Sequence, residues 1–367
     1  MHERATFIGW PVFADRLPCA WNINHEKRVL GNMNYQAGVM GAADVFNKLR
    51  SSINVGAVRA QTRAPFRFLL CGDPGLISEL RSLLLAGGDD EFIPLDAAAT
   101  LETIDPGRPV DTNDARAIVF LGRIGDRDGA RLNVLETFKL PILTLLVDPE
   151  IAAPAGPASA PGPGKVEDYI VSRIEHDALK GRFLPHLIDC CKGIEIAVGL
   201  RLPALRETVC AKLTRDAAMN ALKIAGASAL ADKIPFVGIV LGAFASAGDM
   251  VAITGIQMML MLQIGAVFGK EPDMKRMWEL LPVVGGGFGW RMLSRELSGF
   301  IPVAGIFIKG AIAYAGTIVV GESVTFYFLH GRHMSPSDAS TVYTDAKAAA
   351  MRLGREIFSR LRPRRDP

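Results

Sequence analysis

Residues 66–75 read FRFLLCGDPG, an apolar run that predicts a buried strand and leads directly into a glycine turn. The segment after the turn, residues 76–86, is expected to be a helix. A strand, a glycine turn and a helix form the place where α/β sheets hold phosphate groups on backbone N–H groups. The candidate nucleotide-binding residues are therefore Gly72, Asp73, Gly75 and Ser78.

Strands and helices are expected to alternate from this point to residue 200. The further expected strands are 91–95, 117–121, 142–147 and 169–171, and the further expected helices are 130–139 and 179–200. The run ILTLLV at 142–147 is apolar throughout, as parallel strands are when both faces of the sheet are covered. This alternation predicts a doubly wound α/β sheet. An insert rich in Ala, Pro, Gly and Ser at 151–164 is expected to be a flexible surface loop.

The glycine turn lacks the residues that a GTP-hydrolysing P-loop requires. Counting the motif from Gly72 places Ser78 where the phosphate-binding lysine belongs, and Glu79 where a magnesium-binding hydroxyl belongs. After the 142–147 strand, Asp148-Pro149-Glu150 stands in place of a base-reading Asn-Lys-x-Asp. The α/β part is therefore expected to be a degenerate GTPase-like domain. A nucleotide held by backbone N–H groups of residues 72–75 is the alternative.

Residues 234–330 form a strongly apolar region. The run 251–269 has no charged residue and is about as long as the ~20 residues needed to cross a bilayer. A second run, 300–320, contains only Lys309 as a charged residue. Because a helix that is apolar on all sides must be buried in a core or in lipid, we expect membrane association. Prolines before these runs suit first helical turns and indicate an array of antiparallel helices.

Two sets of residues stand out inside this region. Small residues recur every fourth position and predict close helix packing: Gly238, Gly242 and Ser246. Polar residues form a candidate seam in the membrane: Asp249, Gln257, Gln263 and Lys309. The seam could line a conduit or lock a conformation, with Lys309 as the countercharge of Asp249. Alternatively, Asp249 caps or interrupts a helix and the glutamines satisfy backbone groups between helices.

The composition suits a soluble part joined to an apolar part. Of 367 residues, 49% are hydrophobic, and the mean hydropathy is +0.23. A net charge of +3 is too small to indicate nucleic-acid binding. Six arginines and two carboxylates in residues 352–366 make a basic tail, which suits either an anionic membrane face or a solvated helix end. Five cysteines without a C-x-x-C pair and six scattered histidines predict neither a disulfide framework nor a metal site.

The chain from residue 199 onward carries an ordered set of short motifs. GLRLPALR at 199–206 is followed by Asn220-Ala221, Ile234-Pro235, Gln257, residues 291–297, Ile301-Pro302, Gly316-Thr317, Gly321 and Tyr327-Phe328. This order resembles the YcjF-like bacterial family of unknown function, whose hydrophobic helical domain is often fused behind an Era-like GTPase domain. The resemblance covers about residues 200–331 and implies membrane association, without a catalytic residue to carry over. Upstream, the order of elements resembles the GTPase partner, while every nucleotide-binding motif departs from it.

These features together predict four parts of the chain. They are an N-terminal lead and helix (1–65), a degenerate GTPase-like α/β domain (66–200), a hydrophobic helical domain (201–335) and a basic C-terminal helix or tail (336–367). The first hypothesis is a non-catalytic pseudo-GTPase adaptor or scaffold on the cytoplasmic face of a bacterial inner membrane. Its expected partners are the lipid bilayer, an unknown protein and a second copy of the chain, but no nucleic acid. The alternatives are a GTP-binding switch, with GTP as its one cofactor, and a membrane-active or pore-lining helical bundle.

Overall fold

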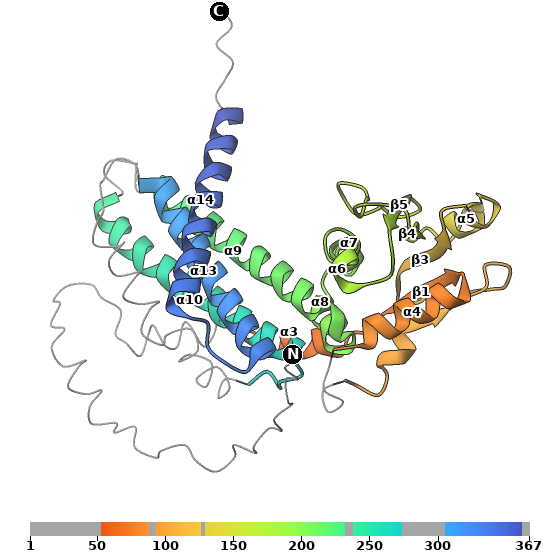
Figure 1. Ribbon diagram of the computed structural model, residues 1–367. Coiled ribbons are helices and arrows are strands. Elements are labelled where there is room, and N and C mark those ends of the chain that lie inside the picture. The colour runs from red at the N-terminus through yellow and green to blue at the C-terminus, as the bar shows by residue number, and fades with distance from the viewer. Residues whose placement is uncertain (1–52, 88–92, 126–128, 232–237, 274–304, 362–367) are drawn as a thin grey trace, which may run out of the picture. The chain divides into compact units, whose positions relative to one another are not determined.

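The computed structural model describes residues 53–87, 93–125, 129–231, 238–273 and 305–361 (Figure 1). Most of the predicted N-terminal part therefore lies outside the described residues, together with Pro235, Pro282 and Pro302 of the apolar region. Residues 47–367 belong to one compact unit. The predicted boundary at residue 200 falls inside a helix, Glu195–Arg201, and the boundary at 335 falls immediately before another, Pro336–Leu361.

Five parallel strands form a single sheet in the order β2-β1-β3-β4-β5. The strands are β1 (Arg67–Gly72), β2 (Leu101–Thr103), β3 (Ala115–Arg123), β4 (Ile142–Val147) and β5 (Val166–Val171). This order is one of the two common doubly wound arrangements. The expectation of a parallel α/β sheet followed by a helical part is therefore confirmed, and the P-loop GTPase assignment stays a prediction.

Helices cover both faces of the sheet. Phe68 of β1 belongs to a buried cluster that also contains Leu80 and Leu187, whereas the neighbouring Leu69 packs in a separate cluster with Leu135. Successive side chains of β1 thus point to opposite faces of the sheet, as they do in any strand. The first cluster also includes residues of α3 (Val55–Thr62), α4 (Pro74–Leu85), α6 (His176–Leu179), α7 (Phe183–Asp189) and α8 (Glu195–Arg201), and the second includes residues of α5 (Gly129–Glu136). Two short 3-10 helices, η2 (Ala97–Thr100) and η3 (Pro203–Leu205), complete the domain.

The second strand lies further along the chain than the sequence predicts. Residues 93–95 of the expected strand 91–95 form no strand, and β2 begins only at Leu101. Pro94 has no N–H for a ladder bond, and the side chain of Leu95 is fully exposed. Leu101 is buried and pairs with Phe68 of β1, so burial against the core selects the later segment.

The long helix expected over residues 179–200 is also wrong. The chain forms α6, α7 and α8 in its place, and Gly193 between the last two has a φ of +87°. A residue with this backbone conformation cannot continue a right-handed helix. The insert at 151–164 is attached to the domain near its start and at its end. Ala155 pairs with Ile170, Arg182 donates to Gly156 O at 2.6 Å, and the Gly164 N–H donates to Leu140 O at 3.0 Å.

The helical part contains α9 (Arg206–Ala231), α10 (Gly238–Val267), α13 (Gly305–His330) and α14 (Pro336–Leu361), as labelled in Figure 1. Helix α13 packs against each of the other three. Two of its glycines allow a close approach to α9: a Cβ at Gly321 would lie 2.2 Å from Thr214 Oγ1, and one at Gly310 would lie 2.8 Å from Leu222 Cδ1. The predicted row Gly238, Gly242 and Ser246 lies in α10, but its packing falls outside the described side chains.

The junction between β1 and α4 is another place where the backbone is too closely packed for a side chain. The N–H of Asp73 donates to Leu121 O of β3 at 2.9 Å. Gly72 beside it has a φ of +115°, and a Cβ at this position would lie only 1.9 Å from the same oxygen. Since the contact is with backbone, no side-chain movement relieves it, and only glycine fits here.

Replacing Gly72 therefore tests how strictly this junction is constrained. We expect Gly72→Ala to lower the free energy of unfolding by about 3 kcal/mol or more, because backbone strain and a steric clash act together. Urea denaturation followed by circular dichroism measures the change. Gly181→Ala is the matched control, since a Cβ at Gly181 meets nothing within 4 Å. Equal denaturation midpoints for the two variants would contradict the described geometry.

Candidate functional site

The candidate nucleotide site lies at the carboxyl ends of β1 and β3. In the strand order 2-1-3-4-5 the chain leaves β1 toward β2 on one side and later returns to β3 on the other. Ligands of doubly wound sheets bind outside the strand ends at this switch point. Gly72 and Asp73 lie there, whereas Gly75 and Ser78 belong to α4.

Very little chain is available at this point to surround a phosphate group. Strand β1 ends at Gly72 and α4 begins at Pro74, so Asp73 is the single residue between them. A P-loop places a glycine-rich loop of several residues here, whose N–H groups point inward at the phosphates. In this chain the Asp73 N–H is already bonded to Leu121 O, and Pro74 has no N–H.

The N-terminus of α4 already holds a carboxylate from its own chain. Asp73 Oδ1 accepts the Leu76 N–H at 3.0 Å, which makes Asp73 the N-cap of the helix. A negative charge at this end of a helix is favourable, and it occupies the position where a bound phosphate would interact. The side chain of Ser78 is exposed on the second turn of α4. The arrangement therefore favours a capped structural junction over an anion site.

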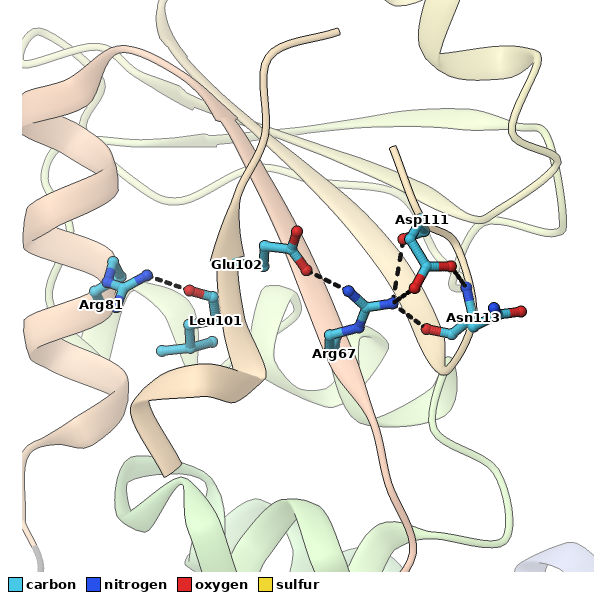
Figure 2. Close-up of polar contacts among 6 residues, drawn as sticks. All are labelled: Arg67, Arg81, Leu101, Glu102, Asp111 and Asn113. Atoms are coloured by element: carbon cyan, nitrogen blue, oxygen red, sulfur yellow. Dashed lines mark hydrogen bonds and ion pairs between the residues drawn. The ribbon is translucent and has the colours of Figure 1, made fainter. Parts of the chain in front are cut away.

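A second polar cluster lies at the opposite, amino end of β1 (Figure 2). Arg67 NH1 lies 2.5 Å from Glu102 Oε2 of β2, and its NH2 lies 3.1 Å from Asp111 Oδ2 and also donates to Asn113 O. The Asn113 N–H lowers the pKa of Asp111, and the Arg67 guanidinium adds to this shift. Arg81 of α4 donates to Leu101 O in the same region. These contacts tie β2 and residues 105–114 to β1, so the cluster has a structural role.

A buried pair that the sequence analysis missed joins β5 to α7. The Tyr169 hydroxyl and Nδ1 of His186 form a hydrogen bond of 2.8 Å, and only 1% of Tyr169 and 9% of His186 is exposed. Burial raises the pKa of Tyr169 and lowers the pKa of His186, so both side chains are neutral. The two residues are 17 positions apart in unrelated motifs, so no sequence pattern could indicate the pair.

The predicted polar seam is described in part. Gln257 Nε2 of α10 donates to Thr317 Oγ1 of α13 at 3.3 Å, and this hydroxyl donates to Ala313 O at 2.9 Å. Gln263 also lies in α10 and is half-buried. Asp249 and Lys309 lie in α10 and α13, but their side chains are outside the described residues, and their pairing stays a prediction. Gln257 lies between two helices, as in the alternative, but it bonds a side-chain hydroxyl and not the backbone group that the alternative expects.

Three comparisons complete the description of the candidate sites. No protein-family model, curated protein or solved structure matches the chain. Within the described ranges, no three His, Cys, Asp or Glu side chains gather in a way that could hold a metal ion.

The buried His186 predicts a pH dependence of stability. Its pKa is lowered from 6.5 in the folded state, so the unfolded chain binds more protons as the pH falls below 6.5. The neutral histidine therefore contributes stability at neutral pH that is lost on acidification. We expect the urea midpoint of His186→Gln to fall less than that of the wild type between about pH 7.5 and about pH 5.5. The same pH dependence in both proteins would contradict a buried neutral His186.

Proposed function

We propose that the chain is a membrane-associated adaptor or scaffold whose α/β part is a pseudo-GTPase-like domain without catalytic activity. The observation that carries the proposal is the Asp73 carboxylate at the N-terminus of α4, with its oxygen 3.0 Å from the Leu76 N–H. A nucleotide phosphate would have to displace this carboxylate or approach it closely. At about 4 Å two unit negative charges repel by roughly 4 kcal/mol near a protein surface.

Other residues at this edge add to the case against phosphate chemistry. Glu79 is exposed on α4, one position after Ser78, and no lysine stands at the motif position that would reach the β- and γ-phosphates. A GTP-binding switch would need these charges to be compensated by a magnesium ion and a positively charged side chain. The adaptor is therefore favoured over the switch.

The membrane part of the proposal rests on α13. Its segment Gly310–His330 is 21 residues long and apolar enough to cross a membrane, and it is the one such segment found among the described helices. A shorter apolar stretch, Ala252–Val267, lies in α10. The core helix of a soluble protein can have the same composition, and 44% of the apolar window in α13 is buried. The resemblance to the YcjF-like family favours the membrane interpretation.

Glu322 limits the way in which α13 could contact lipid. This half-buried carboxylate lies inside the apolar segment, and an acidic side chain at the centre of a bilayer costs about 3 kcal/mol. We therefore propose association in which apolar surface of α13 contacts lipid on the cytoplasmic face of a bacterial inner membrane. The α/β domain would then be available to a protein partner or to a second copy of the chain.

The pore-lining alternative has less support. It needs a polar surface that faces water inside a bundle, whereas Gln257, one of the two seam residues whose side chains are described, is bonded to Thr317 between two helices. Thr317 in turn is fully buried. A polar pair that is satisfied within the protein stabilises helix packing and gives ions no path.

Fractionation of cells that express the full chain tests membrane association. We expect the protein to sediment with membranes, to resist carbonate extraction and to be released by detergent, because apolar contact with lipid survives high pH. A version that ends at residue 200 is the matched control, and it should remain in the supernatant. Recovery of the full chain in the supernatant without detergent would overturn the membrane assignment and leave a soluble helical interaction domain.

A further inference from the structure

Helix α14 folds back onto α13 after a short turn. Gly331 in this turn has a φ of +64°, a conformation that favours glycine. The Ser335 hydroxyl oxygen lies 3.1 Å from the Asp338 N–H and accepts it, as in an N-cap. The start of α14 is therefore well defined, and the helix that follows is packed along α13.

The contact between the two helices is apolar. Tyr343 and Ala346 of α14 are buried with Ala315 of α13, and three more uncharged residues of α13 pack against this cluster: Tyr314, Ile318 and Val319. Ala350, one turn further along α14, is also buried. Among the described side chains of α14, those that are buried are thus one aromatic ring and two alanines.

The other side of α14 is polar and exposed. Four polar residues on this side are exposed to solvent: Asp338, Thr341, Thr344 and Asp345. Charged side chains are costly in the hydrocarbon of a bilayer. While α14 lies along α13 with these residues outward, this part of α13 cannot contact lipid. The covered state that the structure describes and the lipid contact of the proposed function therefore exclude each other on this face of α13.

The C-terminal half of α14 has the composition of a helix that binds anionic membranes. It contains Arg352, Arg355 and Arg360 against one carboxylate, Glu356. Basic residues on a helix that also carries an apolar side favour the interface of an anionic bilayer, through attraction to headgroups and burial of the apolar side. Anionic lipid can therefore compete with α13 for the apolar side of α14.

We propose that α14 is a removable cover of α13. In water α14 lies on α13 and hides Tyr314, Ala315, Ile318 and Val319. At an anionic bilayer α14 leaves α13 and binds the headgroup region, and the uncovered face of α13 contacts the hydrocarbon. This inference rests on the proposed membrane association, and it adds the step that controls when α13 contacts lipid.

A reversible cross-link between the helices tests the cover directly. The full chain carries Ala315→Cys and Ala346→Cys, and its flotation with vesicles of phosphatidylglycerol and phosphatidylcholine is compared before and after oxidation. We expect the reduced protein to float with the vesicles, the oxidised protein to bind severalfold less, and reductant to restore binding. The single variant Ala346→Cys, treated in the same way, controls for oxidation of the native cysteines and should bind equally in both states.

A pair of charge substitutions gives an independent readout. Tyr343→Glu places a charge in the contact with α13 and should raise the vesicle-bound fraction severalfold, because it weakens the covered state. Thr344→Glu places the same charge on the exposed side of α14 and should leave binding close to that of the wild type. Circular dichroism of both variants verifies that the helices are retained.

The outcomes separate the cover from the membrane proposal. Equal flotation of oxidised and reduced protein overturns the cover and leaves membrane association intact. If neither form floats, membrane association itself fails, and the cover fails with it. If reduced protein binds vesicles of phosphatidylcholine alone as well as the anionic vesicles, the role given to the arginines of α14 is wrong.

Discussion

The hydrogen bond from the Asp73 N–H to Leu121 O fixes the backbone at the position where a sheet of this kind usually binds its ligand. It joins the end of β1 to β3 at the switch point of the sheet, and it brings Gly72 so close to the Leu121 backbone that a side chain has no room there. This bond holds Asp73 directly before α4, and the Asp73 carboxylate caps the helix. The chain therefore has no loop here that corresponds to the phosphate-binding loop of a nucleotide-binding sheet. The N–H groups of Asp73 and Leu76, at the usual ligand position of this fold, are therefore already bonded within the protein.

The helical part depends on a different constraint, the burial of an apolar helix. Helix α13 approaches α9 closely at Gly310 and Gly321, bonds α10 through Thr317 and is covered by α14. Its contact with α9 is close at the backbone and requires glycine, whereas its described contact with α14 is made between side chains such as Tyr314, Ile318 and Tyr343. Of the two, the α14 contact is the easier to exchange for another apolar surface. The capped junction of the sheet and the covered apolar helix are the two features that support the proposed adaptor.

The sequence correctly predicts the strands that are most deeply buried. It fails where two neighbouring segments are candidates for the same strand. Apolar runs such as 142–147 and the strand that ends at Gly72 lie where expected, because both faces of the sheet are covered. The sequence predicts the second strand at residues 91–95 and not at Leu101–Thr103, because three residues are too few to show a clear strand pattern. At the candidate site, the missing lysine was evident from the motif. The capping by Asp73 and the pairing of Tyr169 with His186 depend on three-dimensional contacts and have no sequence signature.

Titration of the purified full chain with GTP and magnesium in a calorimeter tests the central claim most directly. The closed junction at Asp73 predicts no saturable binding at nucleotide concentrations up to about 1 mM, which corresponds to a binding free energy weaker than about −4 kcal/mol. Saturable binding with a dissociation constant in the micromolar range would contradict the account. It would mean that the N-terminus of α4 opens to accept a phosphate group, and the chain would then belong with nucleotide-dependent switches.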